Sequence, residues 1–473
     1  MHPKLLRFNR TAGAALLLAL LCDGAVTAQG SRSEAGAPAP PKAILLIGDG
    51  MDQTQITIAR YYLAGYDGWL TLDTLPVRSN VRTQTVVEED PRVPEYVPDS
   101  ANTASSMASG IVTSTGRIAT TASTDRDAPT ILELAAAAGF GTGIVATSSV
   151  TDATPASFVA HVSQRLCESP RAMVTRNESD SAFSTDCSDD LKANGGKGSI
   201  AEQIAASRVD IVLGGGERNF AQPAEGERRK TVRDLAAENG YRVIRTAAEL
   251  ANLSRGGKVL GLFAPGTMPV RWRGIGDAKA ELVQRDENGR VVQPAPFACE
   301  ANPLFGATPT LEAMTRAALN HLDDGRSFVL MVESASIDKQ SHARRPCGQI
   351  GELKQLDDTL KILLDYARAH PETLLLVTAD HGQAAQLVPE TSWLAGLGAA
   401  SPGHFARLRT PEGAVLGVNY ATNDSNLQED HTGVDVPLFA YGARAEQIPA
   451  SLRQTDVFHL MMRHLGLAPP SSP

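Results

Sequence analysis

Five runs of nearly continuous Ile, Val and Leu residues constrain most strongly what this chain can fold into. A strand that buries one face alternates apolar and polar residues, whereas an unbroken apolar run is typical of a parallel strand covered on both faces. Helical patterns lie between the runs, at Ile131–Gly139 and Leu353–His370. This alternation predicts an α/β fold with a doubly wound, mostly parallel central sheet flanked by helices. The predicted strands are Ala43–Gly50, Thr142–Thr147, Val209–Gly216, Ser327–Glu333 and Thr373–His381.

The first residues have the pattern of a signal peptide. A basic start is followed by a short apolar run, Thr11–Leu21, and by a small-residue cleavage sequence, Val26–Ala28. The run is too short for a permanent membrane helix, and the bulky Leu21 before Cys22 disfavours a lipoprotein. No later stretch of the sequence is long and apolar enough for a stable membrane span. We therefore expect residues 1–28 to be removed and the protein to be periplasmic or secreted.

The remaining chain is organised as a linker and one folded region with insertions. Residues 29–41 are small and Pro-rich, which predicts a flexible linker, and the folded domain is expected over 42–473. Residues 217–300 are polar, Gly-rich and less periodic, and residues 383–428 resemble a long loop or hairpin. We expect both segments to be peripheral insertions in that domain.

Cysteine usage agrees with export. Of the 5 cysteines, Cys22 lies in the predicted signal peptide, so an even set remains. In an exported protein such a set predicts two disulfides, with three pairings open. The four remaining cysteines are Cys167, Cys187, Cys299 and Cys347.

Charge and aromatic content argue against nucleic-acid recognition. The chain has 44 Lys and Arg residues against 53 Asp and Glu residues, no basic block, and only 5% aromatic residues. The net charge of −9 gives no reason to attract an anion, unless bound cations make a site locally positive.

Polar residues fall at the carboxyl ends of three predicted strands. Asp49 ends the first run, Glu333 ends the fourth, and Asp380 and His381 end the fifth. A single carboxylate at such a place is usually a helix cap or a turn residue. In open α/β sheets, however, the carboxyl edge forms the ligand crevice, and three strands ending this way indicate a site there.

Two further sets of residues have the chemistry of metal ligands. Asp338 and His342 are spaced i, i+4, so on a helix they share one face, and His431 lies in the sequence EDHTG. Zinc accepts imidazole nitrogen and carboxylate oxygen in sites that can keep one position open. A solvated surface pair is the alternative interpretation of Asp338 and His342.

A serine and an arginine add the chemistry of anion transfer. Ser100 follows Asp99 at the start of a helix-like run, where free backbone N–H groups and the helix dipole favour an anion. An ordinary Ser N-cap is the alternative interpretation. Thr154 offers a hydroxyl, and Arg165, eleven residues later, could grip two phosphate oxygens or be a plain surface arginine.

Taken together, these segments resemble the alkaline phosphatases of the bacterial periplasmic type. The similarity runs from about Lys42 to the C-terminus and rests on six ordered motifs. The motifs are LLIGDGM (Leu45–Met51), PDSANTAS (Pro98–Ser105), TDATPA (Thr151–Ala156), MVESASIDKQSH (Met331–His342), VTADH (Val377–His381) and EDHTG (Glu429–Gly433).

The resemblance implies an activity and the cofactors for it. It implies metal-dependent hydrolysis of phosphate monoesters through a phosphoserine intermediate, for phosphate scavenging, with two zinc ions and one magnesium ion per subunit of a homodimer. It also implies the disulfides Cys167–Cys187 and Cys299–Cys347.

The family pattern also assigns roles to individual residues. Ser100 would be the nucleophile and Arg165 would bind the phosphoryl oxygens. One zinc would be held by Asp338, His342 and His431, and the other by Asp49, Asp380 and His381, with Ser100 facing it. Magnesium would be held by Asp49, Thr154 and Glu333, with Asp152, Lys339 and Asp99 behind these sites.

One departure from the family pattern is visible. Asp52 follows Gly50-Met51, where the family usually has a glycine after the methionine. An extra carboxylate near the metals is expected to alter metal affinity or product release, in a direction that the sequence leaves open.

Three rival functions were weighed. A sulfatase would need Pro and Arg at the second and fourth positions after its nucleophile, where this chain has Asn102 and Ala104. A phosphodiesterase shares the two-metal core, but Glu333, Thr154 and Arg165 suit a dianionic monoester better. A secreted zinc-binding protein without catalysis would not need Ser100 or Arg165.

Overall fold

The computed structural model describes residues 39–174 and 186–468. The predicted signal peptide and nearly all of the predicted linker lie outside the described residues. Among the described residues, no helix has both the length and the apolar character to cross a membrane.

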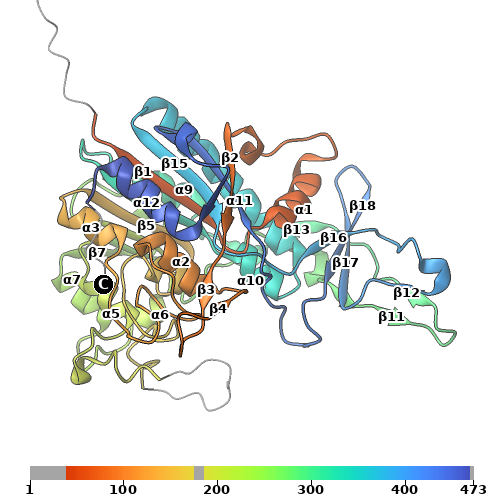
Figure 1. The fold of residues 1–473 in the computed structure, drawn as a ribbon, viewed down its shortest axis with the longest axis horizontal. Coiled ribbons are helices and arrows are strands. Elements are labelled where there is room, and N and C mark those ends of the chain that lie inside the picture. Colours follow the sequence, from red (N-terminus) through yellow and green to blue (C-terminus); the bar gives the residue numbers. More distant parts are fainter. Residues whose placement is uncertain (1–38, 175–185, 469–473) are drawn as a thin grey trace, which may run out of the picture. The chain divides into compact units, whose positions relative to one another are not determined.

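A ten-stranded sheet forms the centre of the described part (Figure 1). Seven neighbouring strands, from β15 to β7, are parallel, and β19 pairs antiparallel with both β15 and β2. The predicted doubly wound, mostly parallel sheet is therefore confirmed. The spatial order is β20 (Ser451–Arg453), β2 (Val77–Arg82), β19 (Val436–Gly442), β15 (Thr373–Ala379), β1 (Lys42–Gly48), β14 (Phe328–Ser334), β5 (Gly141–Ser149), β6 (Ile211–Gly215), β8 (Lys258–Leu262), β7 (Tyr241–Ile244).

The central strands are buried from end to end, as their unbroken apolar sequences predict. Every residue of β1, β5, β14 and β15 is buried. The helices of the described residues are α1 (Gln53–Ala64), α2 (Ser100–Ser109), α3 (Ile131–Ala137), α4 (Ala153–Ala156), α5 (Ile200–Ala206), α6 (Glu217–Phe220), α7 (Val232–Glu238), α8 (Ala247–Ala251), α9 (Leu311–Leu322), α10 (Ser336–His342), α11 (Pro346–Ala369) and α12 (Gln454–Leu465).

These helices form a layer on each side of the sheet. α9 and α11 pack on each other and on β14, and α11 also contacts α1 and α10. α3 and α12 both contact α2, and they pack on β5 and β1 respectively (Figure 1). Covering both faces in this way explains why the intervening strands carry no polar face.

α11 begins seven residues before the helix predicted from Leu353. Its first residue is Pro346, which fits the first turn of a helix because no backbone donor is needed there. The helical pattern of this first part is weak in the sequence because it contains two glycines, Gly348 and Gly351. Gly351 is required by packing, because a Cβ at that position would lie 2.7 Å from the Cβ of Trp272.

The two predicted insertions meet in a smaller sheet. Strand β10 (Glu281–Leu282), from the first segment, pairs with β17 (His404–Arg409) of the second. This four-stranded sheet is completed by β18 (Val415–Tyr420) and β16 (Gln386–Val388). Two-stranded ladders join β11 (Gln284–Arg285) to β12 (Val291–Val292), β13 (Cys299–Ala301) to β9 (Trp272–Gly274), and β3 (Thr85–Val86) to β4 (Pro94–Glu95).

The first half of segment 217–300 differs from the prediction of a peripheral insertion. Its strands β8 and β7 extend the central sheet beyond β6, with parallel pairing. They are short, and only β8 is largely buried, so their sequences lack the long apolar runs of the central strands.

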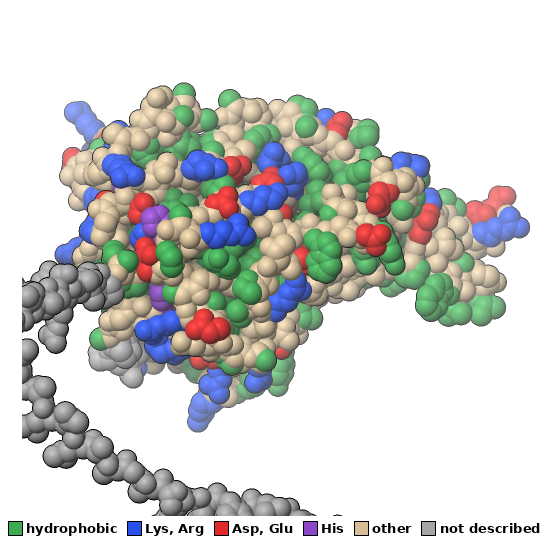
Figure 2. Space-filling model, turned by 90° about the horizontal axis from the view of Figure 1, so that it is seen from above, with side chains coloured by type: hydrophobic (Ala, Val, Ile, Leu, Met, Phe, Trp, Pro, Cys, Tyr) green, Lys and Arg blue, Asp and Glu red, His purple; other side chains and the backbone are tan. Residues whose placement is uncertain are grey.

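Charged side chains of both signs are interspersed over the face drawn in Figure 2. That mixture agrees with the nearly balanced composition of the chain, and it gives no sign of a broad basic surface on this face.

Candidate active site

Strand register brings the polar ends of three strands to one level. Gly48 at the end of β1 pairs with Ser334 of β14 and with Ala379 of β15. The residues that follow, Asp49 and Asp380, therefore leave the same edge of the sheet, and both are buried. The predicted crevice at the carboxyl edge is the place where the candidate residues meet.

Asp49, Asp380 and His381 form the first cluster. The Nε2 atom of His381 lies 3.4 Å from a carboxylate oxygen of each aspartate. Oδ1 of Asp380 accepts the backbone N–H groups of Gly50 and His381, both at 2.9 Å. Oδ2 of Asp380 is buried and makes no hydrogen bond to the described residues. A cation is the partner that such an oxygen lacks.

The charges in this cluster also favour the binding of a cation. Burial, together with Asp380 and Asp338, raises the pKa of the Asp49 carboxyl well above its usual range. Burial lowers the pKa of His381, which favours a neutral imidazole with a free lone pair. Carboxylates and a neutral imidazole are the donor set that zinc accepts.

Asp338, His342 and His431 form the second cluster. The helix α10 places Asp338 and His342 on one face, with Oδ1 of Asp338 3.3 Å from Nε2 of His342 and 3.5 Å from Nε2 of His431. The two imidazole Nε2 atoms are 3.0 Å apart. The structure thus brings the i, i+4 pair and the distant histidine together.

Both imidazoles of the second cluster turn Nε2 toward the Asp338 carboxylate. Nδ1 of His342 lies 2.5 Å from the carbonyl of Glu429, and Nδ1 of His431 lies 2.9 Å from the carbonyl of Pro98. A carbonyl can only accept, so each Nδ1 carries a proton, and Nε2 is the nitrogen that offers a lone pair when the imidazole is neutral. Two lone pairs that face each other beside a carboxylate fit a bound cation.

The Asp338 carboxylate is ready to bind as an anion. Burial alone would raise its pKa, but the positive charge and hydrogen bonds that His342 and His431 supply when protonated outweigh that effect and hold the pKa well below its usual range. The neighbouring Gly50 has a φ of +65°, and a Cβ there would lie 3.0 Å from the Cβ of Asp338. The glycine therefore allows the close approach of the loop after β1 to α10.

Ser100 lies at the first position of α2, beside the first cluster. Its Oγ is 3.0 Å from Nε2 of His381 and 3.5 Å from Oδ1 of Asp49. The helix is capped by Asp99, whose side chain accepts the N–H of Asn102. Because Asp99 is the N-cap, the interpretation of Ser100 as an ordinary cap is wrong, and its hydroxyl is directed at the cluster.

Arg165 is held between two carboxylates at the edge of the site. Its Nη1 donates to Asp99 at 3.0 Å and its Nη2 donates to Asp152 at 3.1 Å. The other oxygen of Asp152 lies 2.6 Å from Nζ of Lys339. Lys339 and Arg165 outweigh the effect of burial and hold the pKa of Asp152 far below its usual range. The guanidinium is therefore fixed in place and is not a loose surface group.

Glu333 and Thr154 form the third candidate set with Asp49. Glu333 and Thr154 are both buried, and α4, which carries Thr154, packs on β14. Burial and the neighbouring Asp152 raise the pKa of Glu333 to about 7. One of its oxygens accepts the hydroxyl of Ser148 at 2.8 Å. Ser148 was missed by the sequence analysis, although its place at the carboxyl end of β5 was a usable signal.

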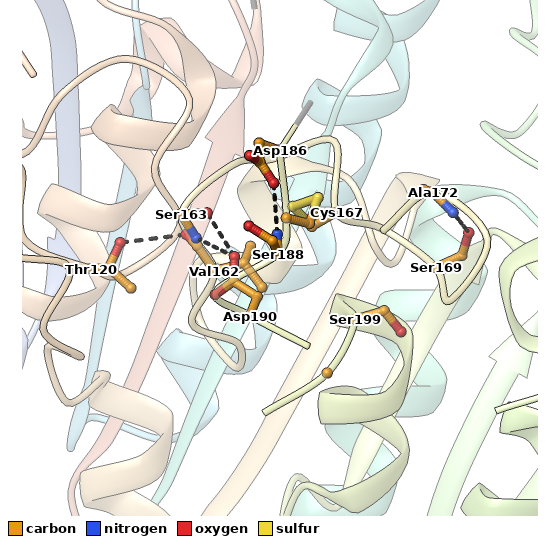
Figure 3. Close-up of a disulfide and its surroundings, with 12 residues drawn as sticks. Thr120, Val162, Ser163, Cys167, Ser169, Ala172, Asp186, Ser188, Asp190 and Ser199 are labelled. Atoms are coloured by element: carbon orange, nitrogen blue, oxygen red, sulfur yellow. Dashed lines mark hydrogen bonds between the residues drawn. A yellow bond between two sulfur atoms is a disulfide. The ribbon is translucent and has the colours of Figure 1, made fainter. Parts of the chain in front are cut away.

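The Cys167–Cys187 disulfide anchors the segment that carries Arg165 (Figure 3). Close to it, Oδ2 of Asp190 accepts the N–H and the hydroxyl of Ser163, at 3.0 and 2.7 Å. The second disulfide, Cys299–Cys347, joins β13 to the first turn of α11. Both pairings implied by the family resemblance are confirmed.

Asp52 has a structural contact that the sequence did not reveal. One of its oxygens accepts the N–H groups of Thr54 and Gln55, at 2.7 and 3.2 Å, and so caps α1. The other oxygen accepts the N–H of Gln383 at 3.1 Å. The carboxylate is therefore occupied by backbone donors and is not an additional metal ligand.

Comparison with known proteins agrees with this geometry. The family model for alkaline phosphatase matches residues 42–467. Streptomycin-6-phosphate phosphatase of Streptomyces griseus is 41% identical over 474 residues, which cover 98% of each chain. Alkaline phosphatase of Escherichia coli K12 is 40% identical over 433 residues, which cover 90% of this chain and 86% of the relative.

Solved structures support the fold. The alkaline phosphatase of the Antarctic bacterium TAB5 has a TM-score of 0.65 at 22% identity and covers 91% of this chain and 99% of its own. That of Thermus thermophilus has a TM-score of 0.63 at 22% identity and covers 91% and 92%. With the matched sequence, the shared fold and the clustered acidic, histidine and serine side chains, this chain belongs to the alkaline phosphatase family of metal-dependent phosphate monoester hydrolases.

Proposed function

We propose that Ser100 is the nucleophile and that hydrolysis runs through a phosphoserine intermediate. The observation that carries the proposal is the place of its hydroxyl, at the first turn of α2 and 3.0 Å from Nε2 of His381. The free N–H groups of that turn and the Arg165 guanidinium would hold the non-bridging phosphoryl oxygens.

Two displacements follow from this arrangement. In the first, Oγ of Ser100 gives its proton to water and bonds to phosphorus as the ester P–O bond breaks, and the leaving alkoxide takes up a proton from water. In the second, a water oxygen bonds to phosphorus and releases a proton, the bond to Oγ breaks, Oγ takes up a proton, and inorganic phosphate leaves.

We propose two zinc sites and one magnesium site per subunit. Asp338, His342 and His431 would hold one zinc, and Asp49, Asp380 and His381 would hold the second, beside Ser100. Asp49, Thr154 and Glu333 would hold magnesium. Such ions, when bound, lower the pKa of a hydroxyl or water and neutralise developing charge. The proposal is supported by the lone pairs and the unpartnered Oδ2 of Asp380 described above.

Asp152, Lys339 and Asp99 have a positioning role in this proposal. Asp99 and Asp152 hold the guanidinium of Arg165 from two sides, and Lys339 holds the second oxygen of Asp152. A planar guanidinium fixed in this way can offer two parallel donors to a phosphoryl group.

The experiment that tests this function measures phosphate release from an aryl phosphate monoester by the purified full chain. Activity is expected with zinc and magnesium present, to disappear after chelation, and to return when both metals are restored. The methyl diester of the same aryl phosphate is expected to turn over far more slowly. Equal rates on the two esters, or turnover that survives chelation, would contradict the proposal.

We further propose phosphate scavenging by an exported homodimer. Two disulfides and the signal-like N-terminal sequence support a periplasmic or secreted location. A group of exposed apolar side chains around the small sheet supports a dimer contact: Leu282, Val292, Trp393, Leu394 and Leu397. Sedimentation analysis of the purified protein tests the dimer.

The scavenging role requires a broad substrate range. One relative is named for a single substrate, streptomycin 6-phosphate. A panel of chemically unrelated monoesters that includes this compound is expected to give similar kcat/KM values. A strong preference for one ester would contradict the scavenging role and would indicate an enzyme dedicated to that ester.

A further inference from the structure

Gln383 lies in the loop after β15 and has no role in the mechanism so far. Its side-chain Nε2 donates to Oδ1 of Asp338, and its Oε1 accepts the N–H of Ala384 at 2.6 Å. Because the backbone donor occupies the amide oxygen, the NH₂ group is the end that faces Asp338. The orientation of the amide is therefore set by the chain itself.

The backbone of Gln383 is held by the first turn of α1. Its N–H donates to Oδ2 of Asp52 at 3.1 Å, and its carbonyl accepts Nε2 of Gln55 at 3.2 Å. Gln55 in turn accepts a hydrogen bond from Gln349 of α11. Side chains from two helices thus fix the loop that carries Gln383.

This chain of hydrogen bonds is closed to solvent. Asp52 and Asp338 are each 4% exposed, and Gln55 and Gln383 are fully buried. Hydrogen bonds in such a low-dielectric interior are stronger than in water, and a broken one leaves a buried group unpaired at considerable cost.

We propose that Asp52 and Gln383 are positioning residues that hold the Asp338 carboxylate in its cation-binding orientation, an arrangement that we call the Asp52–Gln383 relay. The inference rests on the proposed function, in which Asp338 is a zinc ligand. Oδ1 of Asp338 faces His342 and His431, and the Gln383 amide is its further partner. Such outer partners orient ligating carboxylates and typically change metal affinity about 10- to 100-fold when removed.

The role of Asp52 extends beyond capping α1. Capping uses one oxygen of the carboxylate, while the other oxygen reaches across to the loop. A serine at this position can cap the helix, but it has no second oxygen to accept the N–H of Gln383. The substitution Asp52→Ser therefore separates the two roles.

The test compares zinc affinity, measured by competition with a chromophoric chelator, among variants of the full chain. Gln383→Met keeps the length of the side chain without its donor, and Asp52→Ser keeps the cap. Both are expected to weaken zinc binding at the Asp338 site about 10- to 100-fold. Asp52→Ser keeps the helix cap, so its unfolding temperature in the metal-free state is expected to fall only through the unpaired N–H of Gln383.

Thr310→Ala is the matched control. Thr310 caps α9, which has the same length as α1, by accepting the N–H of Ala313 at 3.1 Å. This variant is expected to lose stability while its zinc affinity stays unchanged. Equal loss of zinc affinity in Thr310→Ala and Asp52→Ser would overturn the relay, because the effect would then follow from helix destabilisation alone.

A further variant, Asp338→Ala, separates failure of the relay from failure of the proposed function. If Asp338→Ala loses zinc while Asp52→Ser and Gln383→Met bind it as the wild type does, the relay is wrong and the ligand assignment stands. If Asp338→Ala keeps wild-type zinc affinity, the proposed metal site fails and the relay fails with it.

Discussion

Oγ of Ser100 lies 3.0 Å from Nε2 of His381, although 281 positions separate the two residues in the chain. The contact joins the first turn of a helix to the loop after a central strand. It places the candidate nucleophile directly against the cluster formed by Asp49, Asp380 and His381.

Replacing Ser100 by Ala is expected to abolish the phosphoenzyme and to lower kcat by roughly 10⁴-fold or more, because the variant lacks the hydroxyl that forms the intermediate in the proposed reaction. Acid quenching with a radiolabelled monoester measures the phosphoenzyme directly. Ser109→Ala, at the other end of the same helix, is the control and is expected to be labelled as the wild type is. A labelled Ser100→Ala variant would refute the assignment.

Replacing Arg165 by Ala is expected to weaken inhibition by inorganic phosphate about 10- to 100-fold, since charged hydrogen bonds to a dianion are lost. Arg165→Lys is expected to restore only part of this affinity, because an ammonium group cannot make the bidentate contact. Inhibition constants from steady-state kinetics give the comparison. The exposed Arg208 serves as control, and a phosphate affinity in Arg165→Ala equal to that in Arg208→Ala would remove Arg165 from the site.

The raised pKa of Glu333 predicts how the metal-free protein responds to pH. Its pKa rises from 4.5 to about 7 on folding, so the folded state binds more protons between these values, and stability falls as pH rises through that window. Metal-free Glu333→Gln is therefore expected to be about 1–3 kcal/mol more stable than the wild type at pH 8, with little difference at pH 4.5.

Chemical unfolding of the chelated proteins at several pH values measures this difference. The variant Glu227→Gln, at an exposed position, is the control, and its stability difference from the wild type should not change in this way with pH. A constant difference between Glu333→Gln and the wild type across the range would contradict the pH linkage. With zinc and magnesium restored, the wild type is expected to be more stable than Glu333→Gln, because the wild-type carboxylate then has a cation to bind.

Removal of the Cys167–Cys187 disulfide by a double Ala substitution is expected to cost about 3 kcal/mol of stability for a separation of 20 residues. It is also expected to weaken phosphate binding, because Arg165 lies two residues from Cys167. The double Ala variant of Cys299 and Cys347 is the comparison, since it removes a disulfide remote from Arg165 in sequence. If both variants bind phosphate equally, the first disulfide does not position the arginine.

Much of the fold could be predicted because its signals are local. The apolar runs of β1, β5, β6, β14 and β15 are long enough to be recognised individually, and their unbroken character indicates burial on both faces. Strands β7 and β8 were not predicted, since short strands near the end of the sheet carry a weaker pattern. The start of α11 was missed because Gly348 and Gly351 serve packing and disguise the helix.

The sequence by itself determined which side chains could carry the chemistry. Residue types, their spacing on α10 and their places at strand ends singled out candidate residues of both clusters and Ser100, because each signal is contained in a short stretch of chain. Tertiary structure alone decided how these stretches meet: the register that levels Asp49 with Asp380, and the carbonyls that set which nitrogen of His342 and His431 is free. It also decided that Asp52 contacts Gln383, 331 positions away, because a contact between distant segments depends on how the whole sheet and its helices pack.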